Sequence, residues 1–189
     1  MKSQRKGFTL IELLIVIGIL AVLATITILV LNPAQLFAQG RDSQRIADLG
    51  TVRSAISLYL ATVSSPDLDA AGTCGTNYWG TIASAAENFS GTPTQHANVD
   101  RDIDGTGWVP VNLTNVPGGS PLPALPVDPT NTTTFSYTYQ CNATNLTFEI
   151  NANMESTRYA NGGGDDVEST DGGDTAAVYE VGSDPSLDL

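Results

Sequence analysis

Residues 8–31 read FTLIELLIVIGILAVLATITILVL, and Glu12 is the only charged side chain among them. A helix rises ~1.5 Å per residue, so this segment would extend about 36 Å, which exceeds the roughly 30 Å hydrocarbon core of a bilayer. Soluble helices are rarely apolar on every side over such a length. The segment is therefore predicted to be a transmembrane helix.

The orientation of this helix follows from the seven residues before it, MKSQRKG, which carry three basic side chains: Lys2, Arg5 and Lys6. Positive charges flanking a membrane segment favour the cytoplasmic side, so everything after Leu31 is expected across the membrane. The apolar run is longer than the roughly 7–15 residues of a secretory signal core, and no small-x-small site follows it. The segment is expected to stay in the mature protein as a single-pass anchor of the cytoplasmic membrane.

Residues 32–62 continue the helical pattern with a different face. Asn32-Pro33 interrupts the apolar run, and a proline inside a helix usually kinks it. Beyond it, charged residues alternate with apolar residues that recur at spacings of three and four. These apolar residues are Ile46, Leu49, Val52, Ile56 and Leu60. This pattern predicts one long helix over 8–62, whose second half is amphipathic.

Residues 63–189 are rich in Gly, Pro, Thr, Asn and Ser and contain short strand-like stretches. Alternating β-branched and aromatic residues at 134–141 and 146–154, separated by Asn-Ala-Thr-Asn, predict an antiparallel hairpin. Residues 107–113 are predicted as an edge strand and residues 176–182 as a short strand. The fold class predicted is α+β.

The composition excludes several classes of function. The chain has 20 acidic and 8 basic residues and a formal net charge of −12, which disfavours contact with nucleic acid phosphates. One histidine and two cysteines leave little for zinc, haem or iron–sulfur sites. We predict no catalytic residues and no enzyme, because no nucleophile or acid–base set converges in the sequence.

The junction Lys6-Gly7-Phe8-Thr9-Leu10-Ile11-Glu12 resembles the prepilin cleavage motif of bacterial type IV pilins and type II secretion pseudopilins. In that motif a short basic leader ends in Gly, Phe follows, and an acidic residue stands fifth after the cut. The resemblance implies cleavage between Gly7 and Phe8 by a membrane-embedded prepilin peptidase, N-methylation of Phe8, and polymerisation through the apolar helix.

The resemblance also implies an organisation. Residues 1–7 would be the prepilin leader, 8–31 the transmembrane and filament-core helix, 32–62 the amphipathic half of that helix, and 63–189 an extracytoplasmic head. The expected fold is the long helix packed on a small antiparallel sheet. The implied partners are other copies of the chain, the peptidase, and an assembly ATPase with its platform protein; the product would be an extracellular filament on the cell surface.

Glu12 has a role that physical chemistry supports independently. A lone carboxylate in a transmembrane helix costs ~2.5–3.5 kcal/mol on insertion scales, so it normally has a partner. Cleavage after Gly7 would create an ammonium on Phe8, and methylation would keep its charge. Between staggered neighbouring helices, this ammonium could pair with Glu12 in a dry environment. Phe8 and Glu12 are therefore the predicted assembly residues.

Two further sites are expected in the head. Cys74 and Cys141 make an even count in a region predicted outside the cytoplasm, which favours a disulfide over two free thiols. The acidic stretch near the C-terminus is similar in place and composition to a calcium-binding loop of major pseudopilins. The alternative is that this stretch is a solvated acidic tail that binds no ion. The predicted ligands are five acidic residues: Asp165, Asp166, Glu168, Asp171 and Asp174. No cofactor other than calcium is expected.

Two alternatives to a surface pilin stay open on the sequence. One is a type II secretion pseudopilin, which carries the same helix. The other is a minor tip pilin acting in adhesion or DNA uptake. After Arg53 the only basic residues are Arg101 and Arg158, so direct contact of the head with nucleic acid is not expected.

Overall fold

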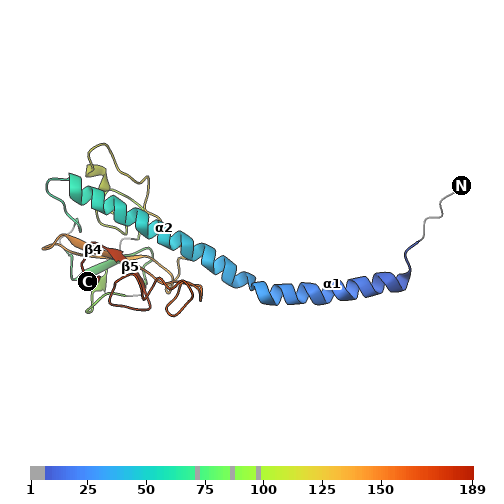
Figure 1. Cartoon of the computed structure of the whole chain (residues 1–189). Coiled ribbons are helices and arrows are strands. Elements are labelled where there is room, and N and C mark those ends of the chain that lie inside the picture. Colours follow the sequence, from blue (N-terminus) through green and yellow to red (C-terminus); the bar gives the residue numbers. More distant parts are fainter. Residues whose placement is uncertain (1–6, 71–72, 86–87, 97–98) are drawn as a thin grey trace. The chain divides into compact units, whose positions relative to one another are not determined.

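The computed structural model describes residues 7–70, 73–85, 88–96 and 99–189. The chain divides into two compact units, Met1–Phe37 and Ala38–Leu189 (Figure 1), and each is described by itself. Except for Gly7, the predicted leader lies outside the described residues.

The first unit is formed mainly by helix α1 (Leu10–Leu31), none of whose residues is buried. The helix ends at Asn32, which adopts a left-handed conformation with φ 40°, and Pro33 opens helix α2 (Pro33–Thr62). A residue before proline is sterically disfavoured in the right-handed helical region, which explains the break at this position. The predicted long helix is thus present over Leu10–Thr62, interrupted at the Asn32-Pro33 step where the proline was expected to kink it.

The second unit contains the sheet, whose strand order is β2-β1-β3-β4-β5. Neighbouring strands are antiparallel except β1 and β2, so the sheet is mixed rather than purely antiparallel as predicted. The five strands are short: β1 (Asn77–Gly80), β2 (Thr94–Gln95), β3 (Thr138–Asn142), β4 (Thr147–Ala152) and β5 (Tyr179–Gly182).

The predicted hairpin is confirmed as β3 and β4, which pair from Thr138 opposite Asn151 to Asn142 opposite Thr147. The Asn142 side chain closes its turn by accepting hydrogen bonds from the backbone N–H groups of Thr144 and Asn145. The strand predicted over 176–182 is present as β5, in its last four residues.

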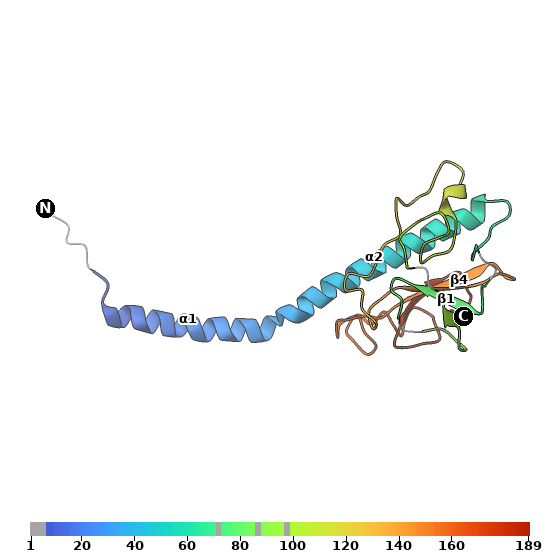
Figure 2. The ribbon, with the colours of Figure 1, turned by 180° about the vertical axis from the view of Figure 1, so that it is seen from behind.

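The core lies where α2 covers one face of the sheet (Figures 1 and 2). Leu49, Val52 and Ile56 of the predicted apolar stripe are fully buried, whereas Ile46 and Leu60 are half-buried. Apolar side chains of the three central strands meet this stripe, and they include three large ones: Tyr139, Phe148 and Ile150.

The edge strand predicted over 107–113 is wrong. This segment is irregular, with a single bridge between Asp104 and Asn112, yet its apolar side chains are fully buried. Gly107 sits so close to the carbonyl oxygen of Asp102 that a Cβ there would lie 2.2 Å from it. The indole of Trp108 donates to the carbonyl of Pro126 at 2.9 Å, so the segment is held by loop contacts instead of a strand ladder.

A buried ionic cluster joins α2 to the head. The guanidinium of Arg45 donates to Asp42 on the same helix and to Asp128 in the proline-rich loop, and all three residues are buried. Glu155, which follows β4, accepts from Arg41 and more distantly from Arg45. The charged residues of an amphipathic helix normally face water, whereas Asp42 and Arg45 are buried here beside the apolar stripe.

The predicted disulfide is present between Cys74 and Cys141, with Cα atoms 4.9 Å apart. It ties the segment after α2 to β3 across a sequence separation of 67 residues. Closing a loop of this length removes unfolded-state entropy worth about 4 kcal/mol in the chain-entropy model.

Candidate functional site

The N-terminal end of α1 carries a capping box formed by Thr9 and Glu12. The backbone N–H of Glu12 donates to Oγ1 of Thr9, and Oε2 of Glu12 accepts from the backbone N–H and the hydroxyl of Thr9 at 2.8 and 2.7 Å. Such a box satisfies N–H groups that a helix start would otherwise leave unpaired. Glu12 thus fixes where α1 begins, immediately after the exposed Phe8.

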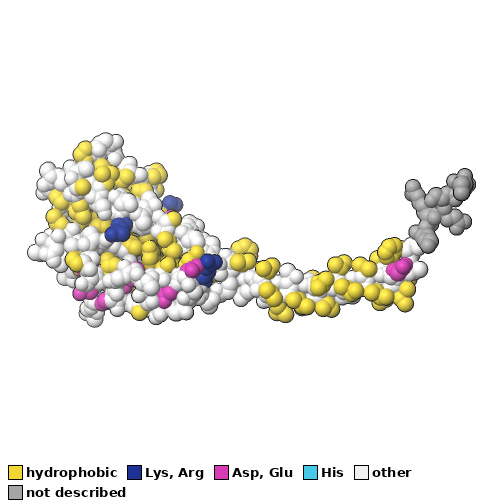
Figure 3. Space-filling model, viewed as in Figure 1, with side chains coloured by type: hydrophobic (Ala, Val, Ile, Leu, Met, Phe, Trp, Pro, Cys, Tyr) yellow, Lys and Arg dark blue, Asp and Glu magenta, His cyan; other side chains and the backbone are white. Residues whose placement is uncertain are grey.

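Helix α1 exposes apolar side chains all round. Its large apolar residues have exposed fractions from 44% at Val16 to 82% at Leu10 (Figure 3). Among the described residues, one helical run is long and apolar enough to cross a membrane, and α1 supplies its apolar part. Contiguous apolar surface on this scale marks a surface that lipid or other protein covers.

No ion pair formed by the described residues involves Glu12, whose hydrogen bonds within that part of the chain come from Thr9. The carboxylate therefore stays available for a cation from another molecule. Its place in the first turn is electrostatically favourable, because the N-terminal end of a helix carries partial positive charge.

The predicted calcium ligands near the C-terminus act as acceptors for nearby loop groups. Asp166 accepts from Gly162 and Ser169, and the buried Glu168 accepts from the backbone N–H groups of Met154 and Asn161, both at 2.8 Å. Within the described part of the chain these carboxylates do not converge as a group of three metal donors.

The remaining three acids of that stretch also have local partners. Asp165 pairs with Arg158 at the surface, Asp171 accepts from the N–H groups of Gly173 and Glu180, and Asp174 contacts Ser90 and Thr175. Calcium binding by these five residues stays a prediction.

The sheet has a second buried face that the sequence did not suggest. Glu149 and Glu180 project from it and are each 1% exposed. Burial raises the pKa of Glu149 to about 7 and that of Glu180 to about 8, because the charged carboxylate is poorly solvated there. Strand alternation places these two acids opposite the apolar face that meets α2.

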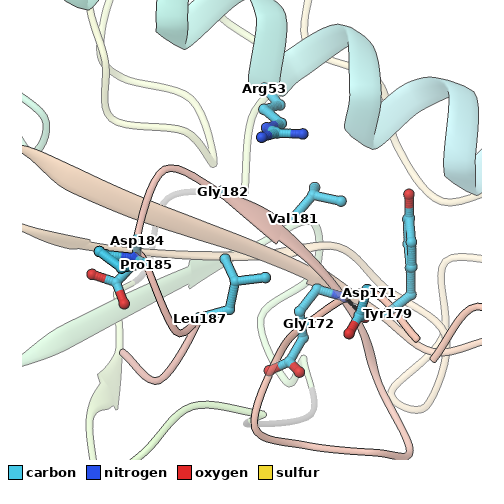
Figure 4. Close-up of a pocket in the computed structure, with 10 residues that line it drawn as sticks. Arg53, Asp171, Gly172, Tyr179, Val181, Gly182, Asp184, Pro185 and Leu187 are labelled. Atoms are coloured by element: carbon cyan, nitrogen blue, oxygen red, sulfur yellow. Dashed lines mark hydrogen bonds between the residues drawn. The ribbon is translucent and has the colours of Figure 1, made fainter. Parts of the chain in front are cut away.

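A cavity of about 370 Å³ opens beside β5, the last strand of the sheet (Figure 4). Arg53 extends into it from α2 toward Val181, and the chain's C-terminal segment forms its other wall through Asp184, Pro185 and Leu187.

Part of the chain is similar to known proteins. Residues 2–28 match the family model described as the prokaryotic N-terminal methylation motif. A fimbrial protein of Dichelobacter nodosus is 41% identical over 71 residues, which are 38% of this chain and 44% of that protein. A type IV major fimbrial protein FimA of the same organism is 41% identical over 69 residues, 36% of this chain and 43% of that protein.

The chain carries the N-terminal methylation motif and is similar, over part of its length, to type IV fimbrial proteins. It spans less than half the length of the curated relatives that it matches. No solved structure is a significant match. The matched N-terminal motif contains Gly7, Phe8 and Glu12, and the α+β architecture agrees with the arrangement expected of a pilin.

Two features of this chain were not predicted from its sequence, although the first of them carries a recognisable signal there. The Thr-x-x-Glu spacing of Thr9 and Glu12 is a helix-start signature that could have been recognised beside the cleavage motif. Arg45 offered no such signal, because its partner Asp128 is 83 residues away and a charged residue in an amphipathic helix is normally solvated.

Proposed function

We propose that this chain is the structural subunit of an extracellular type IV pilus-like filament, assembled through its apolar N-terminal helix. The observation that carries the proposal is α1 itself, which is apolar throughout and has no buried residue. In a membrane this surface would face lipid; in a filament, other copies of the same helix would cover it.

The precursor would be anchored in the cytoplasmic membrane by α1 with its basic N-terminus inside. A prepilin peptidase would cut between Gly7 and Phe8 and the new amino group of Phe8 would be methylated. The apolar helix remains on the product, so the same segment serves first as anchor and then as filament core. An assembly ATPase and its platform protein would extract the subunits from the membrane.

The net negative charge of the mature chain supports assembly through α1 rather than through the head. Loss of Lys2, Arg5 and Lys6 with the leader would leave 5 basic residues against 20 acidic ones. Such subunits repel one another, so the heads contribute little net attraction. The cohesion of the filament would therefore come from α1, together with a pairing between Glu12 of one copy and the Phe8 ammonium of the next.

Mass spectrometry of the mature chain tests this proposal, in a strain that has a prepilin peptidase and its assembly machinery. We expect a first residue of methylated Phe8, and sheared cells should release filaments in which this chain dominates. Gly7→Leu should leave the leader attached and abolish filaments, whereas Gly50→Ala, on the α2 surface with open space around its Cβ position, should change neither. A mature chain that begins at Met1 or after Leu31 contradicts the proposal.

A further inference from the structure

The face of the sheet opposite α2 carries a closely spaced set of polar side chains. β3 contributes Thr138 and Gln140, β4 contributes Glu149 and Asn151, and β5 contributes Glu180; none is more than 3% exposed. The pairings of Thr138 with Asn151, Gln140 with Glu149, and Asn151 with Glu180 put all five on one face of three adjacent strands.

Several oxygens on this face lack hydrogen-bond donors. Six buried side-chain atoms have no partner within the part of the chain that the structure describes, and five of them lie on this face: Thr138 Oγ1, Gln140 Oε1, Thr147 Oγ1, Asn151 Oδ1 and Glu180 Oε1. Buried polar atoms are nearly always paired, because an unpaired one costs about 1–3 kcal/mol. A concentration of unpaired oxygens in one place therefore points to a missing positive partner.

The face is also closed by backbone. The loop before β5 covers Glu180 so tightly that a Cβ on Gly173 would lie 1.9 Å from Glu180 Oε2, and that oxygen accepts from the N–H of Thr175. Glu149 accepts from the Asn151 amide and from the backbone N–H of Leu189. The two carboxylates are thus held in fixed positions beneath this cover.

No basic side chain of the described residues forms an ion pair with either acid. Arg41, Arg45 and Arg158 pair with carboxylates elsewhere, and Arg101 donates to the carbonyl of Leu125. Arg53 extends toward Val181, which alternates with Glu180 and therefore lies on the other face of β5 (Figure 4). Neither acid therefore has a cationic partner among these side chains.

We propose that this face binds one divalent metal ion of the calcium type, with the carboxylates of Glu149 and Glu180 and the amide oxygens of Gln140 and Asn151 as its ligands. All four donors are oxygens, which suit hard cations and not zinc. Calcium accepts six to eight such oxygens in flexible geometry, whereas magnesium keeps several waters, for which this closed face offers little room. The ligands are distinct from the five acids of the C-terminal stretch.

Glu180 is also one of the residues that line the cavity beside β5, which is an edge strand of the sheet. Asp174 is exposed on the loop that covers the site and adds a negative charge near both acids. A cation bound at the site would join three strands to the loop before β5.

The test uses the full-length chain in detergent, stripped of metal with a chelator. Calorimetric titration with calcium chloride should show one ion per chain, and tryptophan fluorescence should show a melting temperature raised by about 5 °C or more at saturation. Magnesium chloride should give a smaller rise. A chain that takes up no calcium overturns the proposal, and an equal response to magnesium contradicts the calcium geometry.

Variants locate the ion. Glu149→Gln with Glu180→Gln should remove the calcium-dependent rise while melting in chelator at or above the wild-type temperature, because the repulsion between the acids is gone. Asp165→Asn, a matched acid-to-amide change in the C-terminal stretch, should keep the full rise. If the double variant does not fold, Glu180→Gln alone should weaken calcium binding at least about tenfold. Unchanged binding in these variants, or loss of binding in Asp165→Asn, overturns the assignment.

Discussion

Arg45 holds Asp128 through two hydrogen bonds, from Nε at 2.6 Å and from Nη2 at 2.9 Å, although 83 residues separate them in the chain. Both side chains are fully buried, and Asp42 contacts the same guanidinium at 2.7 Å. A bidentate pair of this kind fixes direction as well as distance. The contact therefore sets how α2 is seated against the proline-rich loop that carries Asp128.

Removal of this guanidinium should be severely destabilising. Arg45→Met leaves two buried carboxylates without their counter-ion, and breaking a buried pair in this way typically costs 3–5 kcal/mol, so we expect a loss of about that size. Urea unfolding of the full-length chain, followed by tryptophan fluorescence, measures it. Arg158→Met, which breaks the exposed pair with Asp165, is the matched control and should change the unfolding free energy little. Equal losses in the two variants would contradict the role given to Arg45.

The disulfide should contribute stability through the unfolded chain. We expect Cys74→Ser with Cys141→Ser to lower the unfolding free energy by about 4 kcal/mol, since the constraint on a loop of 67 residues is lost. Denaturant titration of this double variant against the oxidised wild type measures the difference. Dithiothreitol should weaken the wild type and leave the variant unchanged; sensitivity of the variant to reductant would show a different target.

Acid should weaken the contact between α2 and the segment after β4. The hydrogen bond from Arg41 lowers the pKa of Glu155 below its usual value of 4.5, and Arg45 adds to the effect. Because the folded pKa is depressed, this contribution is present above pH 4.5 and is lost as the pH falls through the folded value. Glu155→Gln should therefore flatten the decline of unfolding free energy below about pH 4.5. Parallel pH curves for the two proteins would exclude this contribution.

Truncation of a leucine on α2 should lower the unfolding free energy more at a buried position than at an exposed one. Leu49 is fully buried in the core, whereas Leu58 on the same helix is 42% exposed. Leu49→Ala should cost about 2–5 kcal/mol through lost burial and the cavity left behind, and Leu58→Ala much less. Thermal unfolding of the two variants compares the same chemical change at two depths, so similar losses would contradict the packing described.

Features set by local pattern could be predicted from this sequence. The apolar length of α1, the stripe on α2 and the β3–β4 hairpin each follow from residues close together in the chain, as does the helix break at the Asn32-Pro33 step. The disulfide followed from the cysteine count and the expected compartment.

Features that depend on distant partners could not be predicted. The first two strands, β1 and β2, have four and two residues, too few for a periodic pattern. The alternation of Phe148 and Ile150 with Glu149 and Asn151 is typical of a strand with one solvated face, but loops from elsewhere in the chain cover that face. The segment 107–113 has strand-like composition, and its partners turned out to be loops.

Glu12 has two separable roles, as the acceptor in the capping box and as a negative charge. Glu12→Gln keeps an acceptor for the Thr9 N–H but removes the charge, because glutamine also completes such a box. Thr9→Ala weakens the box and keeps the charge. If the carboxylate pairs with the Phe8 ammonium of a neighbouring copy, Glu12→Gln should reduce the yield of sheared filaments by about tenfold or more, whereas Thr9→Ala should reduce it far less. Immunoblots of cell-bound and sheared fractions, with total chain as the reference, measure this yield. Normal filaments from Glu12→Gln would show that helix capping, and not charge pairing, is what this position supplies to assembly.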